Sequence, residues 1–246
     1  HMTMEEVTSH DIDYWVEVMT RMIGIMSQSS LKKPVIEVTH LADDPTVSHI
    51  FLVNDNIPFL VDSATMACAE FGLEVKLISH PIIQIEGRDK DRVLIDKPKN
   101  KNVQLKSLIY IEVSRIDDDN ERQQLQDYLN RVFGQIRCAV ADWKPMLSQL
   151  ETAQSKLGDL GDSGTRKAQQ KFIAWLAADN FTFLGYRHYE KKKDYLVADK
   201  QSGLGLLRPE LDADKNDASQ IKVSDYKVKK QSDLVVLTKV NKLSKI

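Results

Sequence analysis

Asp55 and Asp62 flank the polar part of the stretch VNDNIPFLVDSAT at residues 53–65, and two nearby carboxylates are the residue types that acid–base catalysis uses. An enzyme built on them would need a further group, for which His80 is the candidate. Asp62 also has a simpler role, because it falls where a helix is expected to begin and a carboxylate there interacts favourably with the helix dipole. We favour the helix-start role of Asp62 over catalysis.

The histidines and cysteines do not form a recognisable site in the sequence. Neither cysteine, Cys68 or Cys138, has a histidine beside it, and each falls in a helical pattern, so reduced thiols and a buried Cys68 are expected. Asp43 and Asp44 lie near one histidine, without the spacing of a metal site. The histidines considered as ligands are His40, His49, His80 and His188.

Glycine-containing motifs also fail to predict a cofactor site. Gly203-Leu204-Gly205 lacks the third glycine and the following helix of a dinucleotide-binding fingerprint, so it predicts a strand with a tight turn. The sequence contains neither a Walker phosphate loop nor a G-x-S-x-G nucleophile motif. We expect no metal and no cofactor to be bound by these residues.

The composition excludes several classes of protein. The 246 residues carry 34 Lys and Arg against 36 Asp and Glu, a net charge of -2, which gives no basic field for nucleic acid or an anionic membrane. Apolar residues make up 42% of the chain, enough for a core. No apolar run approaches the roughly 20 residues that span a bilayer, so we expect a cytoplasmic protein. His1-Met2 resembles a cloning remnant, and we expect the chain to belong to a longer protein.

The elements that would position these residues follow from hydrophobic periodicity. Residues 11–27 predict a helix with one apolar face, and 35–39 predict a short strand. Residues 50–53 form an apolar strand that ends in Asn54-Asp55-Asn56, and Pro58 is expected in the first turn of a helix that Gly72 ends. The further predicted strands are 75–87, 93–96 and 108–113, with a solvated basic loop at 97–107.

A long helix is predicted from the acidic residues 117–120 onward, with a kink or restart at Pro145. This order predicts an α+β layer with helices on an antiparallel sheet. After the glycine-rich stretch 158–164 we expect a helix at 166–178, strands at 181–190, 194–199, 203–208 and 233–240, and a polar loop at 209–232. The residues expected to face inward from the three main helices are Ile12, Trp15, Val16, Met19, Met22, Ile23 and Met26; Leu125, Leu129, Val132, Phe133, Ile136, Val140, Trp143 and Leu147; and Phe172, Ile173 and Leu176.

Five strings of the sequence resemble the N-terminal region of the large NAD-specific glutamate dehydrogenases of bacteria. They occur in the expected order and span most of residues 34–240. The strings are VNDNIPFLVDSATM (53–66), ADWKPML (141–147), WLAADNFTFLGYRHYE (175–190), GLGLLR (203–208) and LVVLTKV (234–240).

The resemblance implies both a fold and a role. It implies a ferredoxin-like ACT-type sandwich at 34–157 and a PAS-like α+β domain at 165–246. The residue pattern adds an N-terminal helical segment at 1–33 and a glycine-rich linker at 158–164. The parent enzyme would oxidise L-glutamate to 2-oxoglutarate and ammonium with NAD. This region would be noncatalytic, would bind no cofactor itself, and would contact other domains and subunits of a homo-oligomer.

An alternative role is an amino-acid sensor. In ACT domains that bind amino acids, the loop from the first strand to the first helix carries an Asp and a Gly. Asn56 stands at the position of that Asp, and Phe59 stands at the position of that Gly. Phe59 removes the close backbone approach that glycine permits. The residues that could still contact an effector are Asn54, Asp55, Asn56 and Asp62.

Overall fold

The computed structural model describes the chain in eight stretches and divides it into two compact units. The boundary between the units falls between Gly134 and Gln135, inside the long helix α4 (Asp119–Ala141). The described residues are 8, 10–28, 33–41, 45–86, 93–95, 103–159, 164–211 and 220–222. None of the helices in these stretches combines the length and the hydropathy that crossing a lipid bilayer requires.

The first unit is built on one antiparallel sheet. Its strands are β1 (Val35–Thr39), β2 (Val47–Asp55), β3 (Val75–Ser79), β4 (Ile82–Glu86), β5 (Val93–Ile95) and β6 (Val103–Ser114). The strand order is β1-β2-β6-β4-β5, and β3 also pairs with β6. The chain leaves β2, crosses through helix α3 (Leu60–Glu70) and returns on the far side of β6, which is a split βαβ arrangement. The expected α+β architecture with an antiparallel sheet is present and is consistent with an ACT-like fold.

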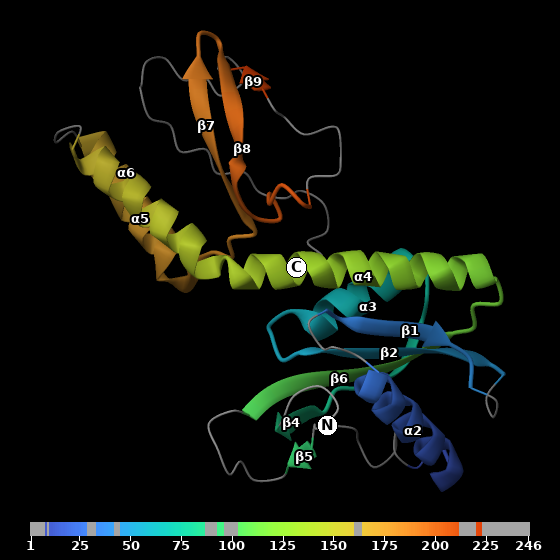
Figure 1. Ribbon diagram of the computed structural model, residues 1–246. Coiled ribbons are helices and arrows are strands. Elements are labelled where there is room, and N and C mark those ends of the chain that lie inside the picture. The colour runs from blue at the N-terminus through green and yellow to red at the C-terminus, as the bar shows by residue number, and fades with distance from the viewer. Residues whose placement is uncertain are drawn as a thin grey trace. The chain divides into compact units, whose positions relative to one another are not determined.

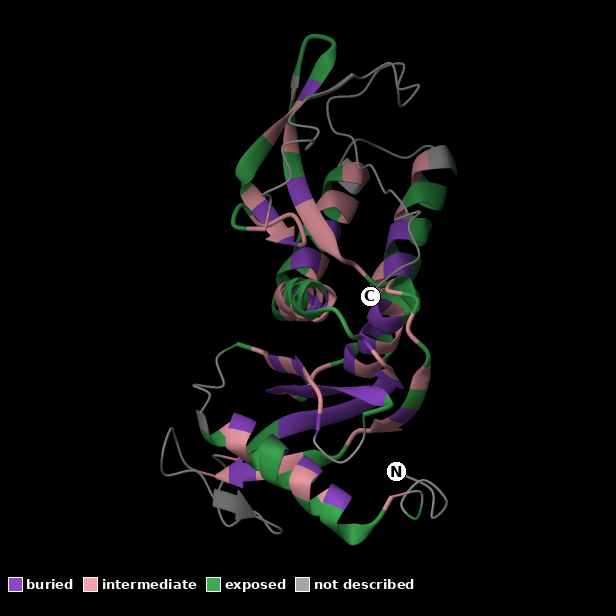
Figure 2. Cartoon of the chain, turned by 90° about the vertical axis from the view of Figure 1, so that its right-hand side faces the viewer, coloured by how far each residue is buried: buried purple, intermediate pink, exposed green. Residues whose placement is uncertain are grey.

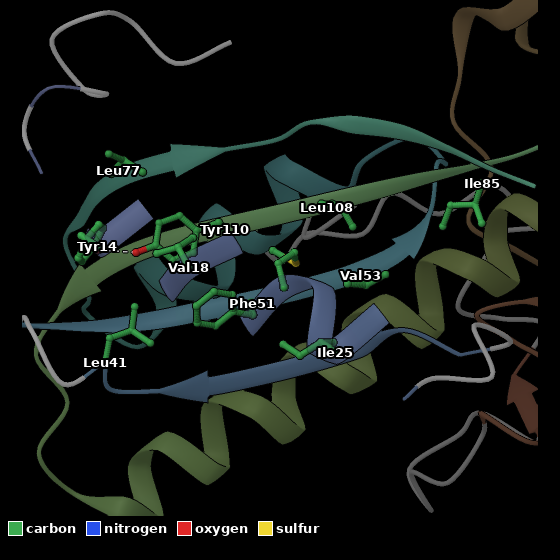
Figure 3. Packing of buried hydrophobic residues seen from close by; sticks show 11 residues of the cluster. Tyr14, Val18, Ile25, Leu41, Phe51, Val53, Leu77, Ile85, Leu108 and Tyr110 are labelled. Atoms are coloured by element: carbon green, nitrogen blue, oxygen red, sulfur yellow. Dashed lines mark hydrogen bonds between the residues drawn. The ribbon is translucent and has the colours of Figure 1, made fainter. Parts of the chain in front are cut away.

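Helices cover both faces of this sheet. Helix α2 (Ile12–Gln28) lies on one face, while α3 and the first part of α4 lie on the other (Figure 1). The central strand β2 is consequently buried along its length up to Asn54, although a strand with one wet face would alternate. Figure 2 shows buried residues concentrated on the central strands. On the α2 side, the core contains Tyr14, Val18, Met22, Ile25, Leu41, Phe51, Val53, Leu77, Ile85, Leu108 and Tyr110 (Figure 3).

Helix α2 forms where the periodicity predicts it, but it turns a different face to the sheet. The buried residues are Tyr14, Val18, Met22 and Ile25. Of the residues expected inside, Met22 is buried and Trp15 and Met26 are partly buried, whereas Ile12, Val16, Met19 and Ile23 are exposed. The prediction was wrong because apolar residues occupy more than half of the helix circumference. The side of α2 that packs on the sheet is the one that contains Tyr14, whose hydroxyl forms hydrogen bonds with polar side chains.

After β2, helix α3 begins later in the sequence than expected. Pro58 lies in a turn, and α3 begins at Leu60 with Phe59 as its N-terminal cap residue, in the left-handed conformation at φ 71°. Gly72 follows α3 with φ +69°, as predicted, and Cys68 is buried. Burial raises the pKa of the Cys68 thiol to about 11, so the thiol stays protonated and is a poor nucleophile near neutral pH.

Two predictions about the later strands needed correction. The single extended segment expected at 75–87 is two strands, because the chain breaks at His80 and Pro81. The basic loop expected at 97–107 is wrong from residue 103 onward, since β6 begins at Val103 and buries both Lys106 and Ser107. Residues 97–102 lie outside the described stretches.

The second unit joins helices to a small antiparallel sheet. Helix α4 ends at Ala141 and α5 (Trp143–Asp159) restarts immediately, with Pro145 in its first turn, where its missing N–H is not needed. Helix α6 (Gly164–Trp175) continues into a short π-helical turn, η2 (Leu176–Asn180). Strands β7 (Gly185–Lys192), β8 (Tyr195–Gly205) and β9 (Gln220–Lys222) pair in the order β7-β8-β9. The small core of this unit is formed by Leu150, Ile173 and Leu176, with Leu157, Ala177 and Phe183 against it.

Some details of the second unit differ from the expectation. The strands predicted at 194–199 and 203–208 are largely one strand, β8, which ends at Gly205. Trp143 and Phe172 were expected inside and are exposed, because α5 and α6 bury only one narrow side against each other. Within the polar stretch 209–232 the three residues of β9 pair with β8. The strand predicted at 233–240 lies outside the described stretches.

Candidate functional site

The strand-to-helix corner at 54–62 is the first candidate site, and Asn56 bonds it to strand β6. Asn54 is buried, and its side-chain Nδ2 donates to the Asp55 carbonyl at 3.1 Å. The backbone N–H of Asn56 donates to the Leu105 carbonyl at 3.0 Å, and the Ser107 hydroxyl donates to Asn56 Oδ1 at 3.0 Å. The two Asn56 bonds hold the corner against β6, whereas the Asn54 bond is local. The turn predicted at Asn54 and Asp55 was wrong, because β2 extends to Asp55 and both residues pair with β6.

Asp55 forms an ion pair with Lys106. The register of β2 against β6 places the two residues directly opposite one another, and Lys106 Nζ contacts Asp55 Oδ1. The lysine side chain is only 2% exposed, while the Asp55 side chain is 39% exposed. A buried ammonium needs an opposite charge, because desolvation of an isolated charge costs several kcal/mol or more. Asp55 therefore serves first to compensate Lys106.

Phe59 and Asp62 complete the corner on its helical side. Phe59 adopts the left-handed conformation, which costs a bulky L-residue about 1–2 kcal/mol and which glycine adopts freely. Its carbonyl accepts the Ser63 N–H at 3.1 Å, which closes the first turn of α3. Asp62 lies in that first turn and is exposed. Of the four predicted residues, the structure joins Asp55 and Asn56 to β6, holds Asn54 inside, and leaves Asp62 on the helix surface.

A second polar group, which the sequence analysis missed, is buried between α2 and the sheet. The Tyr14 hydroxyl lies 2.6 Å from the Tyr110 hydroxyl and donates to Glu112 Oε1 at 2.7 Å. Figure 3 shows the Tyr14 and Tyr110 side chains pointing toward one another from α2 and β6. His49 Nδ1 lies 2.8 Å from the Tyr110 hydroxyl, and His10 Nε2 lies 3.3 Å from Glu112 Oε1.

The surroundings of Tyr110 favour its neutral form. Burial raises the pKa of Tyr110 well above its ordinary value, and the hydrogen bond to Tyr14 and the charge of Glu112 raise it further. The Tyr110 hydroxyl therefore remains a donor, and the bonds of both hydroxyls to Glu112 attach α2 to the sheet. A single carboxylate inside the apolar strand run LIYIEV at 108–113 was the available signal for this cluster.

An apolar hollow with a volume of about 90 Å³ lies beside the same helix. It has Ser79 and the Tyr110 side chain as its polar neighbours, and the rest of its lining is apolar. The lining residues are Trp15, Val18, Met19, Met22, Ser79, Pro81, Leu108 and Tyr110. A space of this size and chemistry suits one aliphatic side chain better than a polar ligand.

In the second unit, a carboxylate is held by a guanidinium and a backbone amide. Arg208 donates from Nε to Asp142 Oδ2 at 2.6 Å and from Nη2 to Oδ1 at 2.7 Å, a bidentate pair. The Gly205 N–H donates to Asp142 Oδ2 at 2.7 Å. These bonds lower the pKa of Asp142, with Arg208 as the main cause. The pair joins the restart of the α4–α5 helices to the end of β8.

Gly203 and Gly205 allow close backbone approach in this unit. Gly205 has φ +60°, and a Cβ there would lie 2.2 Å from the Leu184 carbonyl oxygen. A Cβ on Gly203 would lie 1.9 Å from the Leu207 carbonyl oxygen. Both positions exclude a side chain, which agrees with the predicted strand and turn.

Among the described residues, the remaining histidines and cysteines form no metal cluster. Within the described stretches, no group of three or more His, Cys, Asp or Glu side chains is arranged to hold a metal ion. His40 Nε2 lies 3.0 Å from the Ser48 hydroxyl and 3.1 Å from the Ile116 carbonyl, and burial together with Arg122 lowers its pKa. Burial also lowers the pKa of His80.

Comparison with known proteins places these features in one family. The family model described as the ACT1 domain of glutamate dehydrogenase matches residues 1–129. The chain is 33% identical over 180 residues to an NAD-specific glutamate dehydrogenase of Halomonas elongata. It is 28% identical over 173 residues to an NAD-specific glutamate dehydrogenase of Pseudomonas aeruginosa. Each alignment covers 66% of this chain and 11% of the relative, so the chain spans a small part of those proteins.

Proposed function

Because the chain belongs to the glutamate dehydrogenase ACT1 domain family, we propose that it is a noncatalytic regulatory and assembly region of a large NAD-specific glutamate dehydrogenase. The family match over residues 1–129 carries this proposal, since it takes in all described strands of the first unit's sheet and α3. The complete enzyme would convert L-glutamate, NAD and water to 2-oxoglutarate, ammonium and NADH. NAD would be bound by other parts of that enzyme.

The chemistry of the described residues supports a noncatalytic role. Asp55 faces Lys106, Asn56 faces Ser107, and Asp142 faces Arg208, so these groups hold elements together. The buried thiol of Cys68 is held protonated near neutral pH. The sequence also lacks the glycine fingerprint that a dinucleotide needs. These residues build a scaffold, and its natural partners are other domains and subunits of the same enzyme in the cytoplasm.

For the second unit we propose the PAS-like fold that the family resemblance implies. The antiparallel order β7-β8-β9 beside a helical pair supports this assignment. Its role would be to contact neighbouring domains of the enzyme.

The test compares this chain with the complete enzyme. The purified chain should show no glutamate-dependent reduction of NAD, measured by absorbance. The complete enzyme without residues 1–129 should keep NAD binding but change its sedimentation or its response to effectors. Turnover by the chain alone would contradict the noncatalytic role, and unchanged sedimentation and kinetics in the shortened enzyme would contradict the regulatory and assembly role.

A second candidate function is amino-acid sensing at the corner 54–62. The observation that favours it is the opposite charges of Lys106 and Asp55 beside the exposed side chain of Asn56, because an amino acid carries a carboxylate and an ammonium group. An effector bound there would shift the conformational balance of the parent enzyme.

Calorimetry with the twenty common amino acids tests this candidate. Phe59→Gly should relieve the left-handed backbone strain and open the corner, and it should therefore strengthen any binding. Lys106→Met should abolish the same binding. No heat with the wild type or with Phe59→Gly would rule out the sensor and would leave the assembly role intact.

A further inference from the structure

The outward face of α2 carries a row of apolar side chains. Ile12, Val16, Met19 and Ile23 are 80%, 57%, 50% and 55% exposed. Their spacing of four, three and four residues places them in one stripe along the helix. The opposite face of α2 is already packed on the sheet, so this outer stripe is a second apolar surface on the same helix.

The spacing of the outer stripe is the same in both directions along the helix. An antiparallel copy of α2, related by a two-fold axis, therefore brings Ile12 against the partner's Ile23 and Val16 against the partner's Met19. Every member of the outer stripe then meets another member, which is the condition for a closed, isologous interface. The 3–4 alternation is also the pattern that lets two helices interdigitate.

The charges along α2 favour the antiparallel direction. Asp11 directly precedes α2, Asp13 and Glu17 lie in its N-terminal half, and its C-terminal half carries no acidic residue. Parallel helices would place these carboxylates beside their own copies, whereas antiparallel helices separate them along the axis. Arg21 is directed to β1, where it contacts Glu37, so it does not lie in the outer stripe.

The area of the outer stripe indicates a weak contact. Four partly exposed side chains cover a single helix face, well below the roughly 800 Å² per partner of a standard interface. The hollow lined by Trp15, Met19 and Met22 adjoins the outer stripe and offers space for an aliphatic side chain of the second copy. The contact would thus add to other subunit contacts in a larger assembly.

We propose that the outer stripe of α2 binds the outer stripe of a second copy of this chain in an antiparallel pair. This deepens the assembly role proposed above. Its test uses sedimentation of the chain alone, so it stands or fails separately from any dehydrogenase activity.

Analytical ultracentrifugation over micromolar to sub-millimolar concentrations tests the pairing with two matched variants. Ile23→Lys places a charge in the outer stripe and should raise the dimer dissociation constant about tenfold or more. Ile82→Lys is the control, because Ile82 is 52% exposed against 55% for Ile23 but lies on β4. Ile82→Lys should dimerise as the wild type does. A monomeric wild type at all concentrations, or equal effects of both variants, would overturn the proposal.

Cysteine crosslinking tests the direction of the pair. In a Cys138→Ser background, chains with Ile12→Cys are mixed under mild oxidation with chains with Ile23→Cys. Antiparallel helices should give the mixed disulfide as the main product, since each cysteine lies about 16 Å from its own copy along the axis. Disulfides only between identical chains would indicate parallel helices and overturn the proposed arrangement, and the absence of crosslinks would overturn the pairing.

Discussion

Two of the carboxylate–cation pairs, Asp55–Lys106 and Asp142–Arg208, are opposite in which partner is buried. In the first unit the cation Lys106 is inside, and the anion Asp55 is partly open to water. In the second unit the anion Asp142 is inside, with its side chain 8% exposed, and the cation Arg208 is 31% exposed. The buried partner also differs in its support, because Asp142 receives two guanidinium bonds and the Gly205 N–H.

The difference in which partner is buried predicts which residue of each pair is needed for the stability of its unit. Removing the exposed partner leaves a charge inside the protein, which is expensive, whereas replacing the buried partner by an apolar residue removes the charge that needed compensation. The same chemical pair therefore predicts opposite outcomes for mutations of its acid and its base. Four measurements test this comparison.

Arg208→Met should have the largest effect, a loss of about 3 kcal/mol or more in the stability of the second unit, because the Asp142 carboxylate loses both guanidinium bonds. Hydrogen exchange of the β8 and α5 amides measures it. Arg208→Lys should lose less, since an ammonium keeps the charge without the bidentate geometry. A loss below about 1 kcal/mol for Arg208→Met would show that water compensates Asp142 and would break the comparison.

Asp55→Ala should destabilise the first unit by about 2 kcal/mol, because the ammonium of Lys106 loses its carboxylate. The effect is smaller than at Arg208, since water can enter where the partly exposed Asp55 side chain stood. Exchange of the β2 and β6 amides is the measurement, with Asp62→Ala in the exposed first turn of α3 as the control. Equal losses for the two variants would contradict the pairing as a source of stability.

Lys106→Met should change the stability of the first unit by no more than about 1 kcal/mol, because an apolar side chain of similar length can occupy the same buried space. Urea unfolding of Lys106→Met and of Asp55→Ala, measured in parallel, compares the losses of unfolding free energy in the two variants. Lys76→Met, at an exposed position of β3, corrects for the change in net charge. A Lys106→Met variant less stable than Asp55→Ala would reverse the assignment of the buried partner.

Acid should weaken the second unit through Asp142, which is the smallest and most gradual effect. Arg208 lowers the pKa of this carboxyl in the folded state below its ordinary value of 3.8. Its stabilising contribution is therefore complete above pH 3.8 and is lost as the pH falls through the lower folded pKa. Thermal unfolding between pH 5 and about pH 2 should show this slope in the wild type. The slope should be reduced in Asp142→Asn, and an unchanged slope would assign the acid sensitivity elsewhere.

Much of the fold was predictable where the signal is local. The strand at 35–39 agrees with β1 residue for residue, Gly72 takes the expected positive φ, and the helix restarts at Trp143 with Pro145 in the new first turn. Each of these features depends on a few neighbouring residues and on the conformations that their backbones permit. The restart also shows that the position of a proline in a helix can be predicted from sequence when the only constraint is its missing backbone N–H.

The parts that failed depend on distant partners. The apolar face of α2 could not be chosen from its sequence, because residues on both sides of the helix are apolar. Lys106 and Ser107 were assigned to a loop on account of the basic composition of 97–107, and pairing with β2 made them a buried strand. The cluster around Glu112 joins residue 14 to residues 110 and 112, a separation that no local pattern reports.

The sequence by itself determined the family resemblance, the strand β1, the break between α4 and α5, and the positive φ at Gly72, because these are properties of short contiguous stretches. Tertiary structure alone decided which partner of each ion pair is buried, which face of α2 meets the sheet and which face remains as the outer stripe. Burial is a property of the assembled layers, and the free energy of a charge or an apolar side chain depends on the surroundings that those layers create.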